Sequence, residues 1–398
     1  MSSHTPLREV YFDNSATTPL RPEVKEAMAS VFDVYGNPSS HHSFGKKSNQ
    51  LIKSARADVA ELIGADPDEV YFTSGGSESN NLVLRGAGCT CPAGSGGHCS
   101  AGGRRHVITT KIEHPSVLST CRCLFQEGYD VTFLDVNDKG RVSVDQVEGE
   151  LRSDTLLVSV MFANNEIGTV EPIEEIAAIT RKRGVLFHTD AVQAVGKIPI
   201  DVKKIGVDFL SLSGHKLNGP KGIGALYIHR DIQVCPIITG GHQEKGLRAG
   251  TENLIGIVGL AAAARMAKIE LDEETRRISG LRDRLERGIL ELIPHCQVNG
   301  DPLNRLPNVS NVSFKFIEGE AILYRLDYQG IAVSTGSACS SGSLNPSHVL
   351  LALGLSHEMA HGSIRMSLGR ENTEEDVDYV LSVFPGVIKS LRALSPFS

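Results

Sequence analysis

Residues 155–188 read TLLVSVMFANNEIGTVEPIEEIAAITRKRGVLFH, and this stretch decides the class of fold. It begins and ends with short runs of branched and aromatic apolar residues, which are typical of buried strands. Between them Pro172 stands where a helix can begin and Gly184 where it can end. The residues that share one face of this helix are mainly apolar: Ile173, Ile176, Ala177 and Thr180. The stretch therefore predicts a strand–helix–strand crossover between parallel strands.

The same alternation of short apolar runs and helical stretches extends from about residue 70 to 230, which predicts an α/β fold with a mostly parallel sheet sandwiched by helices. We expect residues 15–260 to form this large domain. The helical stretch 253–292 is too long for one ordinary globular helix, and we expect it to pass from the large domain into a second one. Residues 261–398, joined by 1–14, are expected to form a smaller α+β domain, because they mix strand and helix patterns.

Composition limits the classes of function. The chain has 398 residues, of which 40% are hydrophobic and 22% charged, as in a globular protein large enough for two domains. The net charge of −7 comes with interspersed acidic and basic residues. No basic face is therefore expected to bind the phosphates of nucleic acid.

The sequence contains neither a signal peptide nor an apolar run of membrane-spanning length, so we expect a cytoplasmic protein without a membrane partner. Its eight cysteines are too few for a disulfide framework in a chain of this length. Each is expected to be a free thiol, a nucleophile or a metal ligand.

Several polar residues follow predicted strands, where parallel sheets bind their ligands. Lys216 comes after the apolar run 207–210, and apolar walls there favour a neutral, nucleophilic amine that can form a Schiff base. Asp190 and Gln193 follow the strand 185–188, and a carboxylate there suits the ring nitrogen of a pyridine cofactor. Taken singly, Lys216 could be a solvated loop residue and Asp190 a helix N-cap.

A glycine turn and a histidine occupy similar positions. Residues 69–81 read EVYFTSGGSESNN, which predicts a strand, a turn at Gly76 and a helix start. Free N–H groups at a helix start suit a phosphate monoester, although an ordinary turn capped by Ser77 is the alternative. His114 follows the strand 106–109, where it could stack on a cofactor ring and transfer protons. A lone histidine before proline is otherwise a turn residue.

In combination, these motifs resemble the fold-type-I pyridoxal-phosphate (PLP) enzymes of the class-V aminotransferase family, and more narrowly the NifS/IscS cysteine desulfurases. The resemblance runs from DNSATTP at residues 13–19 to SIRMSLGR at 363–370. It implies that Lys216 binds PLP covalently, with Asp190 at the ring nitrogen. It also implies further cofactor contacts from Gly76, Ser77, His114, Asn165, Gln193, Ser213 and His215.

The resemblance also implies a homodimer. Thr251, within RAGTEN at residues 248–253, matches a residue that reaches the cofactor phosphate from the second subunit.

The segment STGSACSSGS at residues 334–343 would carry the nucleophile, Cys339. Its small, polar neighbours predict an exposed loop, whereas most free cysteines are buried structural residues. The planar fork of Arg365 suits the substrate carboxylate, with Asn14 and Asn165 as helpers. A surface ion pair is the alternative for Arg365.

The implied reaction converts L-cysteine to L-alanine. Lys216 would shift the α-proton, and the Cys339 thiolate would take the sulfur as a persulfide. An iron–sulfur scaffold protein or another sulfur acceptor is the expected partner, and residues 342–350 favour the nitrogen-fixation type. Cys339 could contact an iron–sulfur cluster during transfer.

Other readings remain open. An aminotransferase of the same fold would not need Cys339, and a selenocysteine lyase would share the whole site. A non-catalytic iron–sulfur scaffold or sulfur carrier would need no Lys216. The glycine-rich stretch 86–99 carries Cys89, Cys91, His98 and Cys99, which could bind zinc or iron. Its spacing is not that of a zinc knuckle, so no firm metal site is predicted.

Overall fold

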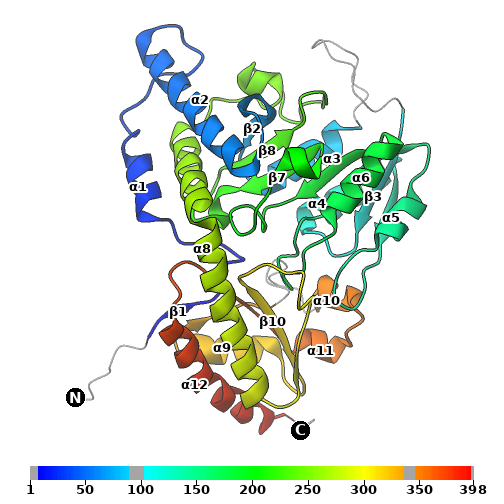
Figure 1. The fold of residues 1–398 in the computed structure, drawn as a ribbon, viewed down its shortest axis with the longest axis vertical. Helices are drawn as coiled ribbons and strands as arrows, with labels where there is room; N and C mark the ends of the chain where they lie inside the picture. Colours follow the sequence, from blue (N-terminus) through cyan, green and yellow to red (C-terminus); the bar gives the residue numbers. More distant parts are fainter. Residues whose placement is uncertain (1–7, 89–102, 336–345, 396–398) are drawn as a thin grey trace.

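The computed structural model describes residues 8–88, 103–335 and 346–395. Its largest sheet has seven strands in the order β2-β8-β7-β6-β5-β3-β4 (Figure 1). The strands of this sheet are β2 (Val70–Thr73), β3 (His106–Thr110), β4 (Asp130–Leu134), β5 (Thr155–Ser159), β6 (Leu186–Asp190), β7 (Phe209–Ser213) and β8 (Gly224–Ile228).

Most neighbours in this sheet run parallel. The pairs β4–β3, β3–β5, β5–β6 and β6–β7 are parallel, whereas β8 is antiparallel to both β2 and β7. Parallel strands need long crossover connections, and helices supply them here. The predicted α/β fold with a mostly parallel sheet is thus confirmed.

The crossover predicted from residues 155–188 is present. Helix α6 (Ile173–Arg183) connects β5 to β6, which pair in parallel with Leu157 opposite Leu186. The helix ends at Gly184, whose φ of 63° is left-handed and costs glycine little. Its four predicted apolar-face residues are all buried.

The sheet separates two apolar cores, and alternate residues of a strand point into different ones. Leu210 of β7 belongs to the core under α2 (Ser43–Ile63), α6 and the first half of α8 (Leu254–Leu292). Its neighbour Phe209 belongs to the core under α3 (Gly76–Gly86) and α4 (Pro115–Gln126). Shorter helices complete this part: α1 (Pro22–Ala29), α5 (Val144–Glu150) and α7 (Val202–Ile205).

A second part of the molecule has its own core, which joins Val10 and Phe12 to residues 278–391. Figure 1 shows it below the large sheet. It contains a three-stranded sheet, a two-stranded sheet and four helices: β9 (Cys296–Val298), β10 (Val309–Phe314), β12 (Ser363–Ser367), β1 (Val10–Tyr11), β11 (Ile331–Ala332), α9 (Gly319–Asp327), α10 (His348–Ala352), α11 (His357–His361) and α12 (Glu374–Arg392).

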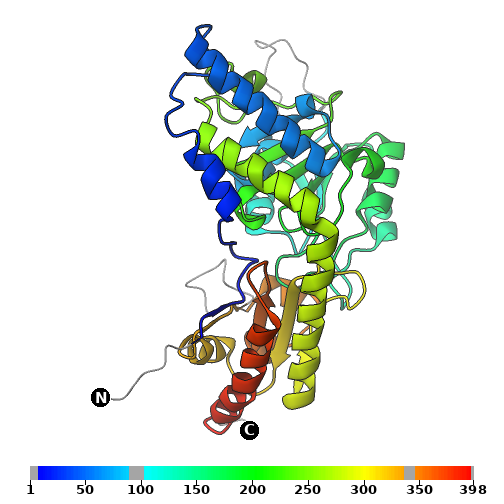
Figure 2. The same ribbon diagram turned by 60° about the vertical axis from the view of Figure 1, so that its left-hand side comes forward.

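Helix α8 connects the two parts. It has 39 residues and continues without interruption from beside α2 to beside α12 (Figure 2). Ala264 packs in the core of the large sheet, and Ile278 of the same helix packs in the second core. The domain division near residue 260 remains a prediction. Of the described helices, none combines the length and the apolarity of a transmembrane span.

Candidate active site

A cavity of about 300 Å³ opens where the parallel strands of the large sheet end. Because parallel strands present their carboxyl ends at one edge, residues distant in sequence converge there. Most of the predicted site residues line this cavity: Gly76, Ser77, His114, Asn165, Asp190, Gln193, Ser213, His215, Lys216 and Arg365.

Lys216 ends a short 3-10 helix (Gly214–Lys216) directly after β7. Its Nζ donates hydrogen bonds to the carbonyl oxygens of Ser15 and Ala16, at 2.5 and 2.6 Å. These acceptors belong to the N-terminal segment, which lies across the cavity from the large sheet. The amine is therefore held at the meeting point of the N-terminal segment and β7.

Asp190 is the last residue of β6 and is only 5% exposed. Its Oδ1 accepts the backbone N–H of Val192 at 3.0 Å, and its Oδ2 accepts from Asn80 Nδ2 at 2.6 Å. No helix begins at this point, so Asp190 is not a helix N-cap. Both carboxylate oxygens are therefore held in place by hydrogen-bond donors.

The Gly75-Gly76 turn joins β2 to α3, so the free N–H groups of the first helical turn face the cavity edge. A Cβ on Gly76 would lie 2.5 Å from Cγ2 of Val192, which explains the need for glycine. Ser213 and His215 border the same cavity. Burial, followed by the charges of Lys216 and two other lysines, lowers the pKa of His215 to about 4, so its imidazole is neutral near pH 7.

His114 is the N-cap of α4 and also lines the cavity. The two alternatives for this residue, a turn residue and a residue of the site, therefore do not exclude each other. Its Nδ1 accepts the backbone N–H of Ser116 at 3.1 Å and lies 2.8 Å from Ser116 Oγ. Burial lowers the pKa of His114 and the positive charge of Lys216 adds to this, while the negative charge of Asp190 opposes it. The neutral imidazole is therefore favoured.

Arg365 lies on β12, and its side chain is 2% exposed. Nη1 donates to the carbonyl of Asn165 at 3.1 Å, and Nη2 forms an ion pair with Asp13 Oδ1 at 2.8 Å. Its Nε is buried and has no hydrogen-bond partner among residues 8–88, 103–335 and 346–395. An unpaired guanidinium donor beside a cavity is suited to an anionic group, because leaving it unpaired is costly.

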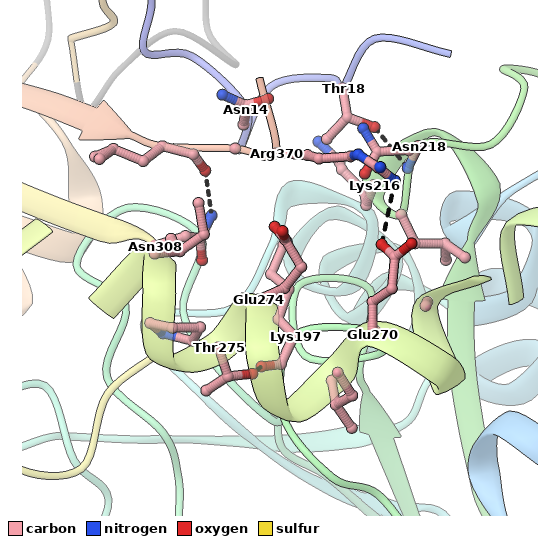
Figure 3. A pocket seen from close by; sticks show the side chains of 18 of the residues that line it. Asn14, Thr18, Lys197, Lys216, Asn218, Glu270, Glu274, Thr275, Asn308 and Arg370 are labelled. Atoms are coloured by element: carbon pink, nitrogen blue, oxygen red, sulfur yellow. Dashed lines mark hydrogen bonds and ion pairs between the residues drawn. The ribbon is translucent and has the colours of Figure 1, made fainter. Parts of the chain in front are cut away.

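Two predicted residues lie elsewhere. Asn14 lines an adjoining pocket, shown in Figure 3, where Lys216 forms part of the wall. Its Nδ2 donates to the carbonyl of Ser367 at 2.9 Å, so it braces β12 instead of facing Asn165. Thr251 is exposed and is not among the residues that line either pocket.

The sequence analysis missed three residues of the site. Asn80 lines the cavity one helical turn beyond Gly76, and Ser116 lines it two residues beyond His114. Lys197 donates to Oε1 and to the carbonyl of Gln193, at 3.0 and 3.1 Å. Helical spacing from Gly76 would have indicated Asn80, whereas Ser116 and Lys197 have no such signal in the sequence. Burial, then the charges of Lys216 and another cation, lowers the pKa of Lys197 to about 7.

The predicted nucleophile Cys339 and the cysteines Cys89, Cys91 and Cys99 lie outside the described residues. Within the described ranges, no group of three or more His, Cys, Asp or Glu side chains is arranged to hold a metal ion.

Known proteins resemble this chain along almost its whole length. The family model described as aminotransferase class-V matches residues 10–380. A cysteine desulfurase of Trichormus azollae is 51% identical over 98% of this chain and 95% of its own length. Cysteine desulfurase IscS of Methanosarcina thermophila is 50% identical over 99% of this chain and 95% of its own length.

Solved structures show the same relationship. A NifS-like protein has a TM-score of 0.88 and 39% identity, covering 96% of this chain and all (100%) of its own. SspA in complex with cysteine has a TM-score of 0.78 and 38% identity, covering 90% of this chain and 98% of its own. The chain therefore belongs to the class-V aminotransferase family, with the fold of the fold-type-I PLP enzymes, and within it to the cysteine desulfurases.

Proposed function

We propose that this chain converts L-cysteine to L-alanine with PLP as cofactor, and that Cys339 receives the sulfur as a persulfide. The observation that carries the proposal is the single cavity in which Lys216, Asp190, His114 and Arg365 converge. The names of its relatives support the reaction, and the SspA structure with cysteine supports the substrate.

The described residues fit PLP. The N-terminal turn of α3 offers N–H groups for a phosphate, and Gly76, which has no Cβ, packs against Cγ2 of Val192 at this turn. The Asp190 carboxylate, held by Asn80 and Val192, suits a protonated ring nitrogen. When bound, PLP would supply an electron sink for the negative charge that develops at the substrate Cα.

The chain's own residues would then orient the substrate and transfer its proton. Arg365 would bind the substrate carboxylate through its unpaired Nε, with Asn165 beside it. Lys216 would take the proton from Cα and return it to the carbon skeleton, because its Nζ is held at the cavity by the carbonyl oxygens of Ser15 and Ala16.

Cys339 would perform the sulfur transfer. Its thiolate attacks the substrate sulfur, a new S–S bond forms, and the bond between that sulfur and Cβ breaks. The electron pair of the broken bond remains with the carbon skeleton, which is protonated and leaves as alanine. The persulfide would then pass to an iron–sulfur scaffold protein or another acceptor. Thr251, which is exposed, would complete the phosphate site of the partner in a homodimer.

The test is to supply L-cysteine without a reductant, quantify alanine, and locate the added sulfur by mass spectrometry. We expect a persulfide on Cys339. Cys339→Ser should keep the cofactor absorbance and lose about 10³-fold or more of the alanine formation. Cys123→Ser, a matched change at an exposed cysteine of α4, should have no effect.

Other outcomes would favour the alternatives. An aminotransferase should survive Cys339→Ser, and a scaffold should lack the cofactor absorbance or keep it unchanged in Lys216→Ala. Alanine release with an unmodified Cys339 would refute the proposal. Comparing L-cysteine with L-selenocysteine would show whether the chain is instead a selenocysteine lyase.

A further inference from the structure

A chain of hydrogen bonds connects Asp190 to His114 through two residues without an assigned role. Asn80 Nδ2 donates to Asp190 Oδ2 at 2.6 Å and to Ser116 Oγ at 2.8 Å. Ser116 Oγ lies 2.8 Å from His114 Nδ1. Asn80 is 1% exposed, so water does not compete strongly for its amide.

The chemistry at the two ends fixes the direction of every bond. A carboxylate oxygen only accepts, so the group of Asn80 that faces Asp190 is its NH₂. The same NH₂ donates to Ser116 Oγ, and the hydroxyl hydrogen of Ser116 is then directed to His114 Nδ1. At the other end the backbone N–H of Ser116, which can only donate, also points at Nδ1. Nδ1 must therefore be an acceptor without a hydrogen.

This arrangement determines what His114 can do. With Nδ1 unprotonated, a neutral imidazole carries its hydrogen on Nε2, the other ring nitrogen of a residue that lines the cavity. A proton on Nδ1 would point at the two hydrogens that Ser116 directs to this nitrogen, one from its hydroxyl and one from its backbone N–H. The imidazolium is therefore disfavoured. We infer that Asn80 and Ser116 are positioning residues that hold His114 as the neutral tautomer protonated at Nε2, which makes it a hydrogen-bond donor to the substrate or cofactor and not a base.

Other charges around His114 are consistent with this state. The positive charge of Lys216, after β7, disfavours the imidazolium of His114, whereas the negative charge of Asp190, at the end of β6, favours it. His348, from α10, faces the same region, and burial lowers its pKa, so it is neutral as well. Glu113, the preceding residue, has a pKa raised well above its ordinary value by burial and so adds little negative charge.

The inference rests on the proposed function, since it takes the cavity as the active site. It also changes the role that the sequence predicts for His114, from a group that transfers protons near neutral pH to a fixed donor. A neutral imidazole that polarises an oxygen is a known catalytic device.

Nitrogen-15 NMR of the holoenzyme, labelled only in its histidine rings, tests the inference. Subtracting the spectrum of His114→Gln identifies the two signals of His114. We expect Nδ1 to have the shift of an unprotonated nitrogen and Nε2 that of a protonated one, without titration between pH 6 and 8. In the wild-type spectrum, a hydrogen on Nδ1 of His114, or a cationic ring at pH 6.5, would overturn the inference.

Variants test the two positioning residues. Ser116→Ala and Asn80→Ala remove the hydroxyl donor or its orientation and leave only the backbone N–H of residue 116 at Nδ1, so the titration midpoint of His114 should rise toward about 6.5. Ser116→Thr keeps the hydroxyl and should restore the wild-type signals. Ser119→Ala, the same change at an exposed serine of α4, is the control and should have no effect.

If both alanine variants keep the wild-type titration midpoint of His114, Asn80 and Ser116 do not position it and the inference is wrong. Because the spectra do not depend on turnover, absence of desulfurase activity would refute the proposed function and leave the tautomer result standing.

Discussion

Arg365 combines almost complete burial with an unpaired donor. Two of its guanidinium nitrogens are bound within the protein, by Asp13 and Asn165, while Nε has no partner in the part of the chain that the structure describes. The ion pair with Asp13 holds the fork in place, so that binding a carboxylate needs little reordering of the side chain. A buried donor without a partner lowers the stability of the fold. Binding of a substrate carboxylate by this donor would account for its presence.

Replacing Arg365 by lysine tests this role. Lysine keeps the charge but loses the planar fork, so we expect KM for L-cysteine to rise about 10- to 100-fold with a smaller change in kcat. Steady-state alanine formation measures both constants. Arg325→Lys, at an exposed arginine of α9, is the matched control. An unchanged KM in Arg365→Lys would exclude Arg365 as the carboxylate ligand.

Lys197 should make the free energy of unfolding depend on pH. Its pKa is lowered to about 7 in the folded chain, chiefly by burial, whereas an unfolded lysine titrates near 10.4. Between these values the unfolded state binds more protons, so the free energy of unfolding contributed by Lys197 increases from pH 7 to about 10. Lys197→Met should therefore be more stable than the wild type at pH 7, with the difference shrinking by pH 9.5. Urea denaturation at both pH values measures this, and a constant difference would contradict it.

The site depends on strand β8, although β8 contributes none of the cavity residues. Gly224 begins β8, opposite Thr73 of β2 and Ser213 of β7. A Cβ at Gly224 would lie 2.7 Å from Cα of Gly75 and 2.6 Å from the carbonyl oxygen of Leu212. Both contacts are with backbone, so neither can move away cheaply.

Gly224→Ala is expected to displace the turn that precedes α3. We predict a cofactor affinity at least about tenfold weaker and a loss of about 1–3 kcal/mol in the free energy of unfolding. Titration of the apoenzyme with PLP, followed by absorbance, measures the first effect. Gly149→Ala, within α5 and with open space around its Cβ, should instead be neutral or stabilising by about 0.5–1 kcal/mol. Unchanged PLP affinity in Gly224→Ala would disprove the link.

The sequence predicted those elements whose signals are local. The β5–α6–β6 crossover follows from apolar spacing and from Gly184, and the ends of parallel strands identified Asp190 and Lys216. The position of β8 between β2 and β7 could not be predicted, because it depends on pairing between distant segments. The distinct placement of Asn14 has the same cause, since its partner Ser367 lies far along the chain.

Helix α8 connects the two apolar cores, and so does the segment from Arg305 to Val312, which is bound to α8. At about 1.5 Å per residue, its 39 residues span about 58 Å. Glu286 of α8 accepts two hydrogen bonds from Arg305, at 3.0 and 2.8 Å, and one from Ser310 at 3.0 Å. The segment that carries Arg305 continues through Val309, in the core of the large sheet, to Val312, in the second core.

Breaking this ion pair should destabilise both cores. Glu286→Gln leaves the Arg305 guanidinium, 6% exposed, without its charge partner, and we expect a loss of about 3–5 kcal/mol. Urea denaturation followed by circular dichroism and by cofactor absorbance should show both midpoints shifting together. Glu291→Gln, at an exposed position of the same helix, should change stability by less than about 0.5 kcal/mol. If the two midpoints in Glu286→Gln moved apart, the cores would be independent.

The position of β8 also sets an order of events during synthesis. Strand β2 and the turn after it leave the ribosome before β3 to β7, yet among the described strands β2 pairs with β8 alone. At about 5–20 residues per second, β2 waits on the order of ten seconds for its partner. During that interval its edge is unpaired and the nascent chain has no complete binding site for a phosphate. A cofactor can therefore join this protein only after the whole large sheet has emerged, and until then β2 is open to chaperones and to aggregation.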